Sequence, residues 1–103
     1  MQQQASAIYA AMDIGSNTIE VLIARCSSNN VEIIEHQTTM TRLGESVDEK
    51  GEISRDKFKM ALDAVCKYQR LATNRGAGEI LAIVFRLLLV DGIHGISVLL
   101  VRR

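Results

Sequence analysis

The chain has 103 residues, with 12 basic and 12 acidic side chains, 48% hydrophobic residues and no proline. This length allows one domain at most, and the composition is typical of a chain that folds rather than of a disordered one. A net charge of zero excludes the broad cationic surface on which non-specific binding to nucleic acids or anionic membranes depends. We therefore expect neither kind of partner.

The cysteine pattern and the chain ends bear on the cellular compartment. Cys26 and Cys66 lie far apart and match neither a zinc site nor a disulfide framework, so we expect two buried thiols in a reducing cytoplasm. Residues 1–7 lack the features of a secretory signal, and charged residues interrupt the apolar stretch 80–101 before it is long enough to span a bilayer. The sequence predicts a cytoplasmic protein.

Three strands are predicted in the first forty residues. Residues 8–14 are apolar and read as a mostly buried strand, and 18–26 are rich in Ile, Val and Leu, as in a strand covered on both faces. Residues 31–39 are more polar, which is typical of a strand with a solvent-exposed face or edge. Turn-forming residues separate these strands at 15–17 and at 27–30.

A helix follows the loop 41–52. Ser54 is its predicted N-cap, and Ile53 before the cap is placed to pack on Phe58. Arg75 and Gly76 end the helix. The stripe expected to face the sheet consists of Phe58, Ala61, Leu62, Val65, Tyr68 and Ala72.

A further strand is predicted at 79–84, after the helix. The order is then three sequential strands, a helix and another strand. This order predicts an α/β layered fold that has begun but is incomplete within these residues.

The residues with the clearest chemistry lie between the first two strands. Asp13 ends an apolar strand, where a carboxylate is costly unless it finds a cation or hydrogen-bond donors. Gly15 lets a ligand approach the backbone closely, and the amides and hydroxyls of Ser16, Asn17 and Thr18 can converge on phosphate oxygens. Asp13 could then hold Mg²⁺ through water. The alternative is that Asp13 and Asn17 merely stabilise a tight hairpin through side-chain hydrogen bonds.

The surrounding sequence favours the first interpretation, because several motifs occur in one order at one spacing. They are Asp-Ile-Gly-Ser-Asn-Thr at 13–18, Thr-Arg-Leu-Gly-Glu-Ser-Val at 41–47, the helix after Ser54, and Gly-Ala-Gly-Glu-Ile at 76–80. Together they resemble the exopolyphosphatase and guanosine pentaphosphate phosphatase (Ppx/GppA) family of the actin-like ATPase superfamily. The resemblance covers residues 7–83. Sugar kinases and Hsp70-type ATPases share the Asp-x-Gly, but the Ser-Asn-Thr continuation is similar to the phosphatase branch.

The resemblance implies a ribonuclease-H-like lobe whose first hairpin holds phosphates, with Mg²⁺, in a cleft between two lobes. It implies hydrolysis of a terminal phosphoanhydride of polyphosphate or guanosine pentaphosphate, and a homodimeric full-length protein. By position, Asp13 is the metal-linked carboxylate, Gly15, Ser16, Asn17 and Thr18 form the phosphate clamp, and Arg42 faces the anionic substrate. His36 is expected to be a surface side chain rather than a general base.

The chain departs from the family pattern at two places. Family members usually carry a basic residue where this chain has Glu20, so either Glu20 points away from the substrate or binding is altered. After residue 83 the family pattern stops, and 84–103 form a divergent apolar tail. A frameshift is one hypothesis for the tail, and a short strand at 96–101 that caps the sheet is the other.

The leading interpretation is therefore a fragment of an exopolyphosphatase-like hydrolase, inactive alone, because the family's catalytic glutamate is expected later than residue 83. Two alternatives remain open. One is a non-catalytic phosphate-binding or chain-pairing module with an exposed sheet edge. The other is a truncated actin-like kinase.

Overall fold

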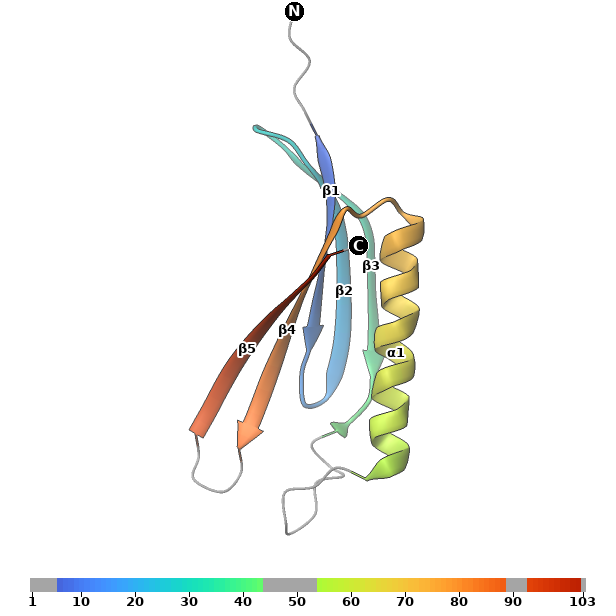
Figure 1. Cartoon of the computed structure of the whole chain (residues 1–103), viewed down its shortest axis with the longest axis vertical. Helices are drawn as coiled ribbons and strands as arrows, with labels where there is room; N and C mark the ends of the chain where they lie inside the picture. Colours follow the sequence, from blue (N-terminus) through green and yellow to red (C-terminus); the bar gives the residue numbers. More distant parts are fainter. Residues whose placement is uncertain (1–5, 44–53, 89–92, 103) are drawn as a thin grey trace, which may run out of the picture.

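The computed structural model describes residues 6–43, 54–88 and 93–102. They form a five-stranded mixed sheet with one helix against it (Figure 1). The elements in chain order are β1 (Ala7–Ile14), β2 (Thr18–Cys26), β3 (Val31–Met40), α1 (Arg55–Asn74), β4 (Glu79–Leu88) and β5 (Ile93–Arg102). The α/β class and the predicted order of elements are confirmed.

The strands lie in the order β3-β2-β1-β4-β5. β1, β2 and β3 form an antiparallel meander, whereas β4 pairs with β1 in parallel. Parallel pairing needs a long crossover, and α1 provides it by carrying the chain from β3 across the sheet to β4. β1 therefore lies in the middle of the sheet, with neighbours on both sides.

The tail differs in extent from the short strand considered for 96–101. β5 runs from Ile93 to Arg102 and pairs antiparallel with the whole of β4, from Glu79 opposite Arg102 to Leu88 opposite Ile93. β4 itself continues to Leu88, beyond the predicted end at residue 84. In Figure 1 these two strands extend the sheet on the side away from α1.

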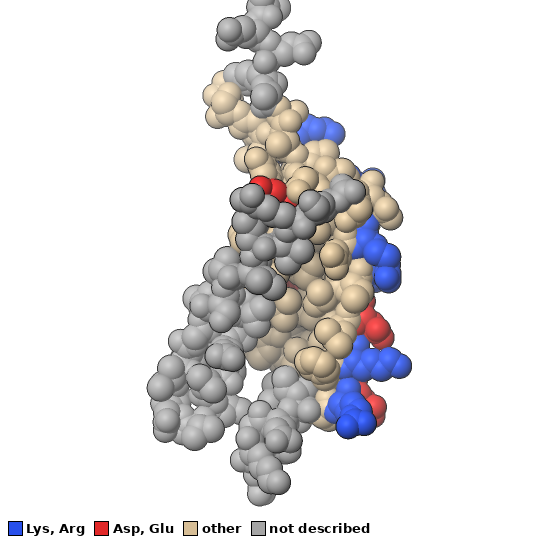
Figure 2. Space-filling view, in the orientation of Figure 1, with Lys and Arg blue, Asp and Glu red and all other residues tan. Residues whose placement is uncertain are grey.

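The core lies between α1 and one face of the sheet. Alternate residues of each strand point to this face, as the two-residue period of a strand requires. The buried hydrophobic side chains that make up this core are Ala10, Met12, Ile19, Val21, Ile23, Ala64, Tyr68, Ala72, Ala77, Ile80 and Ala82. The charged side chains of α1 lie along the outer side of the molecule (Figure 2).

The opposite face of the sheet, which we call the open face, has no helix over it in the described part of the chain. Tyr9 and Leu22 on this face are 45% and 39% exposed. The expectation that residues 18–26 are covered on both faces is therefore not met here. Ile19, Val21 and Ile23 satisfy the apolar pattern by packing on one face only.

The two ends of α1 match the sequence prediction. The Ser54 hydroxyl accepts a hydrogen bond from the backbone N–H of Lys57 at 3.3 Å, which is N-cap geometry. At the other end Gly76 has a φ of 89°, a left-handed conformation that a glycine adopts without strain. Residue 53 lies outside the described residues, and so does its predicted contact with Phe58.

The buried stripe of α1 differs from the predicted one. Ala64, Tyr68 and Ala72 are buried as the centre of the contact, whereas Phe58 and Leu62 are 54% and 48% exposed. The two alanines have small side chains, so the helix can approach the sheet closely along their line. Phe58 and Leu62 lie to one side of that line. Assigning them to the core was therefore wrong.

The predicted burial of the two thiols is also wrong in part. Cys66 lies on an exposed position of α1, and Cys26, at the end of β2, is half-buried. Both thiols are free.

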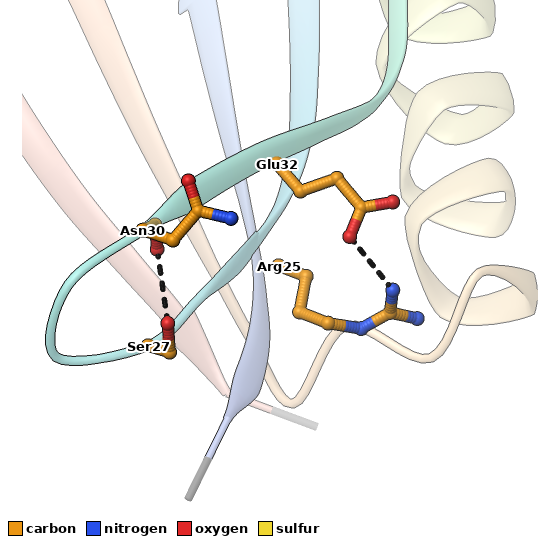
Figure 3. Close-up of polar contacts among 4 residues, drawn as sticks. All are labelled: Arg25, Ser27, Asn30 and Glu32. Atoms are coloured by element: carbon orange, nitrogen blue, oxygen red, sulfur yellow. Dashed lines mark hydrogen bonds and ion pairs between the residues drawn. The ribbon is translucent and has the colours of Figure 1, made fainter. Parts of the chain in front are cut away.

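The β2–β3 hairpin is closed by the predicted turn at 27–30. The backbone N–H of Ser27 donates to the carbonyl of Asn30 at 2.9 Å, and its hydroxyl donates to the same carbonyl (Figure 3). Nearby, Arg25 and Glu32 form an ion pair of 3.1 Å across the two strands. Both side chains are half-exposed, so solvent screens this pair and it adds little to stability.

Two contacts join β3 to α1. The hydroxyls of Thr39 and Tyr68 are hydrogen-bonded, and Tyr68 is 1% exposed. At the end of the helix, Arg75 pairs with Glu35 at 3.0 Å. The first of these is partly buried, and such a hydrogen bond that loses one partner leaves the other poorly satisfied.

We predict that Tyr68→Phe lowers the free energy of unfolding by about 1 kcal/mol, because the Thr39 hydroxyl loses its partner in a partly buried site. Tyr9→Phe is the matched control, since Tyr9 is 45% exposed and should change stability by less than about 0.5 kcal/mol. Urea unfolding of both variants measures the difference. Equal effects would show that the Thr39–Tyr68 contact does not hold α1 on the sheet.

Candidate functional site

The turn between β1 and β2 is a tight one. β1 ends at Ile14 and β2 begins at Thr18, and the backbone N–H of Gly15 donates to the carbonyl of Thr18 at 2.9 Å. Ser16 and Asn17 form the tip of this turn. A Cβ atom on Gly15 would lie 3.3 Å from the Thr18 carbonyl oxygen, which is a close approach. Glycine at this position therefore keeps the backbone free of side-chain bulk where the chain reverses.

The turn is held from outside by the segment that follows β3. The carbonyl of Asn17 accepts hydrogen bonds from the backbone N–H groups of Thr41 and Arg42, at 2.8 and 2.9 Å. The Thr41 hydroxyl donates to the same carbonyl at 3.4 Å, and Thr41 is fully buried. Three donors on one carbonyl fix the position of the turn relative to the end of β3.

These bonds bring Arg42 beside the turn, as the sequence interpretation requires. Its backbone has a φ of 52°, which an arginine seldom adopts, so the surrounding hydrogen bonds hold it there. The side chain is exposed, and its Nε donates to the sulfur of Met40 at 3.4 Å. Within the described residues the guanidinium pairs with no carboxylate, which leaves it available to an anion.

Asp13 lies on the open face, as the second-to-last residue of β1 before the hairpin. Its register partners are Glu20 on β2 and Ile83 on β4. The side chain is exposed and makes no hydrogen bond or ion pair within the described parts of the chain. The alternative in which Asp13 stabilises the hairpin by bonding to the backbone therefore finds no support in its contacts.

The side chains at the tip of the turn likewise have no hydrogen-bond partners in the described part of the chain. Ser16, Asn17 and Thr18 make no side-chain hydrogen bond to any residue that the structure describes. The backbone N–H groups of Ser16 and Asn17 also lack a described acceptor. Hairpin stability thus rests on Gly15, Thr18 and the bonds to the Asn17 carbonyl, and at the tip Asn17 is exposed while Ser16 and Thr18 are half-buried.

Glu20 points to the same face as Asp13, two residues along β2 from Thr18. Its carboxylate accepts a hydrogen bond from the Thr38 hydroxyl at 3.5 Å and lies 3.9 Å from Nε2 of His36. The Glu20 side chain is 45% exposed and that of His36 is 55% exposed. Glu20 therefore leans toward β3 but stays on the open face, and His36 is a surface residue as predicted.

A shallow hollow of about 380 Å³ lies on the open face beside these groups. Its lining is mostly apolar, with the two carboxylates and the imidazole at one side, and consists of Ala11, Met12, Asp13, Glu20, Leu22, Ile33, His36 and Ile83. Among the described residues no group of three or more His, Cys, Asp or Glu side chains is arranged to hold a metal ion. Of the two carboxylates beside the turn, that of Asp13 is exposed and has no partner among the described residues, so it is the one that a metal could approach.

Sequence reasoning missed Thr41. It was placed at the start of a loop, because a single threonine after a polar strand carries no signal of burial. Its role depends on the Asn17 carbonyl, which lies 24 residues away in the sequence. The rest of the predicted 41–47 motif, from residue 44, lies outside the described residues, as do the glycines and charges of the 44–52 loop.

Comparison with known proteins gives a result at the level of structure. No family model matches the sequence, and no curated protein matches it. Solved structures do match. A PPX-GPPA enzyme from Aquifex aeolicus superposes with a TM-score of 0.72 at 25% identity, over 78% of this chain and 27% of that one. An exopolyphosphatase from Cytophaga hutchinsonii superposes with a TM-score of 0.69 at 21% identity, over 75% and 25% of the two chains.

The described fold is therefore an α/β lobe of the actin-like ATPase type. More narrowly, it is the fold of part of a Ppx/GppA phosphatase, and the resemblance seen in the sequence is confirmed by the structure. The chain spans about a quarter of the length of these solved structures. The one helix that the structure describes is not long and apolar enough to cross a membrane.

We predict that Gly15→Ala costs about 1 kcal/mol of unfolding free energy, because the added methyl group presses on the Thr18 carbonyl that closes the turn. Gly78→Ala is the matched control, since a Cβ atom there meets nothing within 4 Å. Urea unfolding compares the two variants. If both lose the same stability, the close approach at Gly15 is relieved by a small backbone shift and does not constrain the turn.

Proposed function

We propose that this chain supplies the phosphate-binding hairpin of a Ppx/GppA-type hydrolase, which cleaves terminal phosphoanhydride bonds of polyphosphate or guanosine pentaphosphate. One observation carries the proposal. The Asp13–Thr18 turn is fixed in place by its backbone, while its polar side chains have no partners among the described residues. A rigid turn with unused donors is what binding of a multiply charged anion needs, because little ordering remains to be done on binding.

The phosphate oxygens would be held by the tip of the turn. The unpaired polar groups of Ser16, Asn17 and Thr18 act as donors, and the absence of a side chain at Gly15 allows the phosphate to approach the backbone. Arg42 adds a positive charge close to the turn, since its backbone is bonded to the Asn17 carbonyl. Arginine suits this role because its planar fork binds phosphate through two parallel hydrogen bonds.

Asp13 fits a role toward Mg²⁺. A hard cation prefers oxygen ligands and keeps several waters, so a single exposed carboxylate beside a phosphate is an adequate protein contribution. When bound, the ion offsets the negative charge of the phosphates. Asp13 would orient the hydrated ion against the substrate held by the turn.

We expect these 103 residues to bind phosphate without hydrolysing it. The resemblance places the glutamate that activates the attacking water later than residue 83, and the sequence from 84 to 103 contains no glutamate. Hydrolysis needs charge stabilisation and a positioned water in addition to binding. Mg²⁺-dependent release of phosphate from polyphosphate by the purified chain would overturn this expectation.

A second candidate function is that of a chain-pairing module. The observation that favours it is the edge strand β3, where Val31 and Ile33 are 65% and 63% exposed. An exposed edge with apolar side chains can pair with another chain through its unused backbone groups. A dimer that dissociates in Ile33→Lys, together with no phosphate binding by the original chain, would favour pairing over the phosphate site.

We predict that Asp13→Asn changes tripolyphosphate binding in opposite directions with and without Mg²⁺. In saturating Mg²⁺ the affinity should fall roughly tenfold, because the carboxylate that orients the hydrated ion is lost. In EDTA it should rise about threefold, because a negative charge about 7 Å from the bound phosphate is removed. Isothermal titration of the 103-residue chain measures both values.

Asp63→Asn is the control for this experiment, since Asp63 is an exposed residue of α1 and its loss changes the net charge equally. It should leave both affinities unchanged. Changes in affinity in Asp63→Asn that equal those in Asp13→Asn in both buffers would mean that the position of the carboxylate beside the Asp13–Thr18 turn does not govern binding. Undetectable binding by the original chain and by all variants would refute the proposed function.

A further inference from the structure

We propose that Glu20 makes the Asp13–Thr18 turn select phosphate chains whose charge is already reduced by bound Mg²⁺, in preference to free polyanions. This inference rests on the proposed function, because it concerns which form of a phosphate ligand the same turn accepts. It assigns Glu20 a specificity-determining role, and it starts from where the structure places this carboxylate.

Glu20 lies close to the turn and on the side that a ligand of Asp13 would occupy. It is the register partner of Asp13 and follows Thr18 by two residues on the same face of β2. Two residues along a strand span about 7 Å, which is shorter than the Debye length of about 10 Å at 0.1 M salt. A phosphate chain bound at the turn is therefore within electrostatic reach of Glu20.

The contacts of Glu20 hold it on the open face, and its described partners include no permanently charged cation. Its carboxylate meets the hydroxyl of Thr38 and the imidazole of His36, at 3.5 and 3.9 Å. Within the described residues no lysine or arginine pairs with it. These contacts draw the side chain toward β3, so it is directed away from an ion beside Asp13 while still repelling an anion there.

Asp13 and Glu20 thus have different effects although both are carboxylates. The Asp13 carboxylate, at the end of β1, has no hydrogen-bond or ion-pair partner among the described residues, so it can approach a hydrated cation. Glu20 is turned to its β3 partners and contributes mainly its negative field. With both charges facing the same side, a free polyanion is repelled twice, whereas a phosphate chain carrying Mg²⁺ brings a positive charge to this pair.

The experiment compares tripolyphosphate binding by the original chain and by Glu20→Gln, in EDTA and in saturating Mg²⁺ at low salt. Removing one charge about 7 Å from one ligand charge should raise the affinity about threefold in EDTA. In Mg²⁺ the gain should be smaller than about 1.5-fold, because the ion screens the repulsion. The selection is measured by the ratio of the affinity in Mg²⁺ to the affinity in EDTA, compared between the original chain and Glu20→Gln.

Two further variants separate the electrostatic role from a structural one. Thr38→Val removes the hydroxyl partner of Glu20 without changing any charge, and it should leave both affinities as they are. Glu32→Gln removes the same charge at the far end of β2 and β3, and it should also have no effect. The thermal midpoint of each variant shows whether the fold is retained. If Thr38→Val reproduces the gain of Glu20→Gln, the effect comes from local structure and the inference is wrong.

The outcomes distinguish this inference from the proposed function. If Asp13→Asn shows its opposite changes in EDTA and Mg²⁺ but Glu20→Gln binds like the original chain, only the role of Glu20 is refuted. An equal gain in affinity for Glu20→Gln in both buffers would also refute selection, because the repulsion between Glu20 and the ligand would then not depend on bound Mg²⁺. No binding by the original chain and by any variant, Glu20→Gln included, would refute both proposals.

Discussion

The carbonyl of Asn17 is the point on which the candidate site depends. It accepts two backbone N–H groups and the hydroxyl of a fully buried threonine, so the turn between β1 and β2 is fixed to the end of β3. Without these bonds the tip of the hairpin would project freely from the sheet. With them, the backbone of Arg42 is placed beside Ser16 and Asn17, and residues from two separate parts of the sequence form one surface. The bonds use the backbone, which leaves the side chains of the turn available for a ligand.

Local signals were enough to predict the turn, the helix cap and the strands that frame them. Gly15 and Ser54 act through their nearest neighbours in the chain, so the residue types indicate the geometry. The burial of Thr41 and the exposure of Phe58 depend on contacts between distant segments, and no local pattern encodes them. Helical periodicity identified a stripe on α1 but could not fix its centre, because alanines permit a closer approach than the larger side chains beside them.

The sheet is unequal on its two faces, and this asymmetry explains both the overestimated burial of β2 and the exposure of the candidate site. The apolar content of residues 18–26 predicted cover on both sides, but α1 packs on one side and the side chain of Leu22 remains 39% exposed on the other. Asp13 and Glu20 lie on that second side. A carboxylate tolerates such a position because it stays solvated there, whereas on the α1 face it would need a partner to offset its desolvation.

The pairing of Asp13 with Glu20 limits what the turn can bind. Directly opposed carboxylates on neighbouring strands repel each other, so the arrangement costs stability unless solvent or a cation offsets it. The structure reduces the cost by turning Glu20 toward Thr38 and His36 on the next strand. Asp13 is then the carboxylate nearest the turn, and it has no hydrogen-bond or ion-pair partner among the described residues. In the proposed role, a ligand that brings both phosphate oxygens for the turn and a positive charge for the carboxylates would suit both parts of this surface, whereas a free polyanion would suit only the turn.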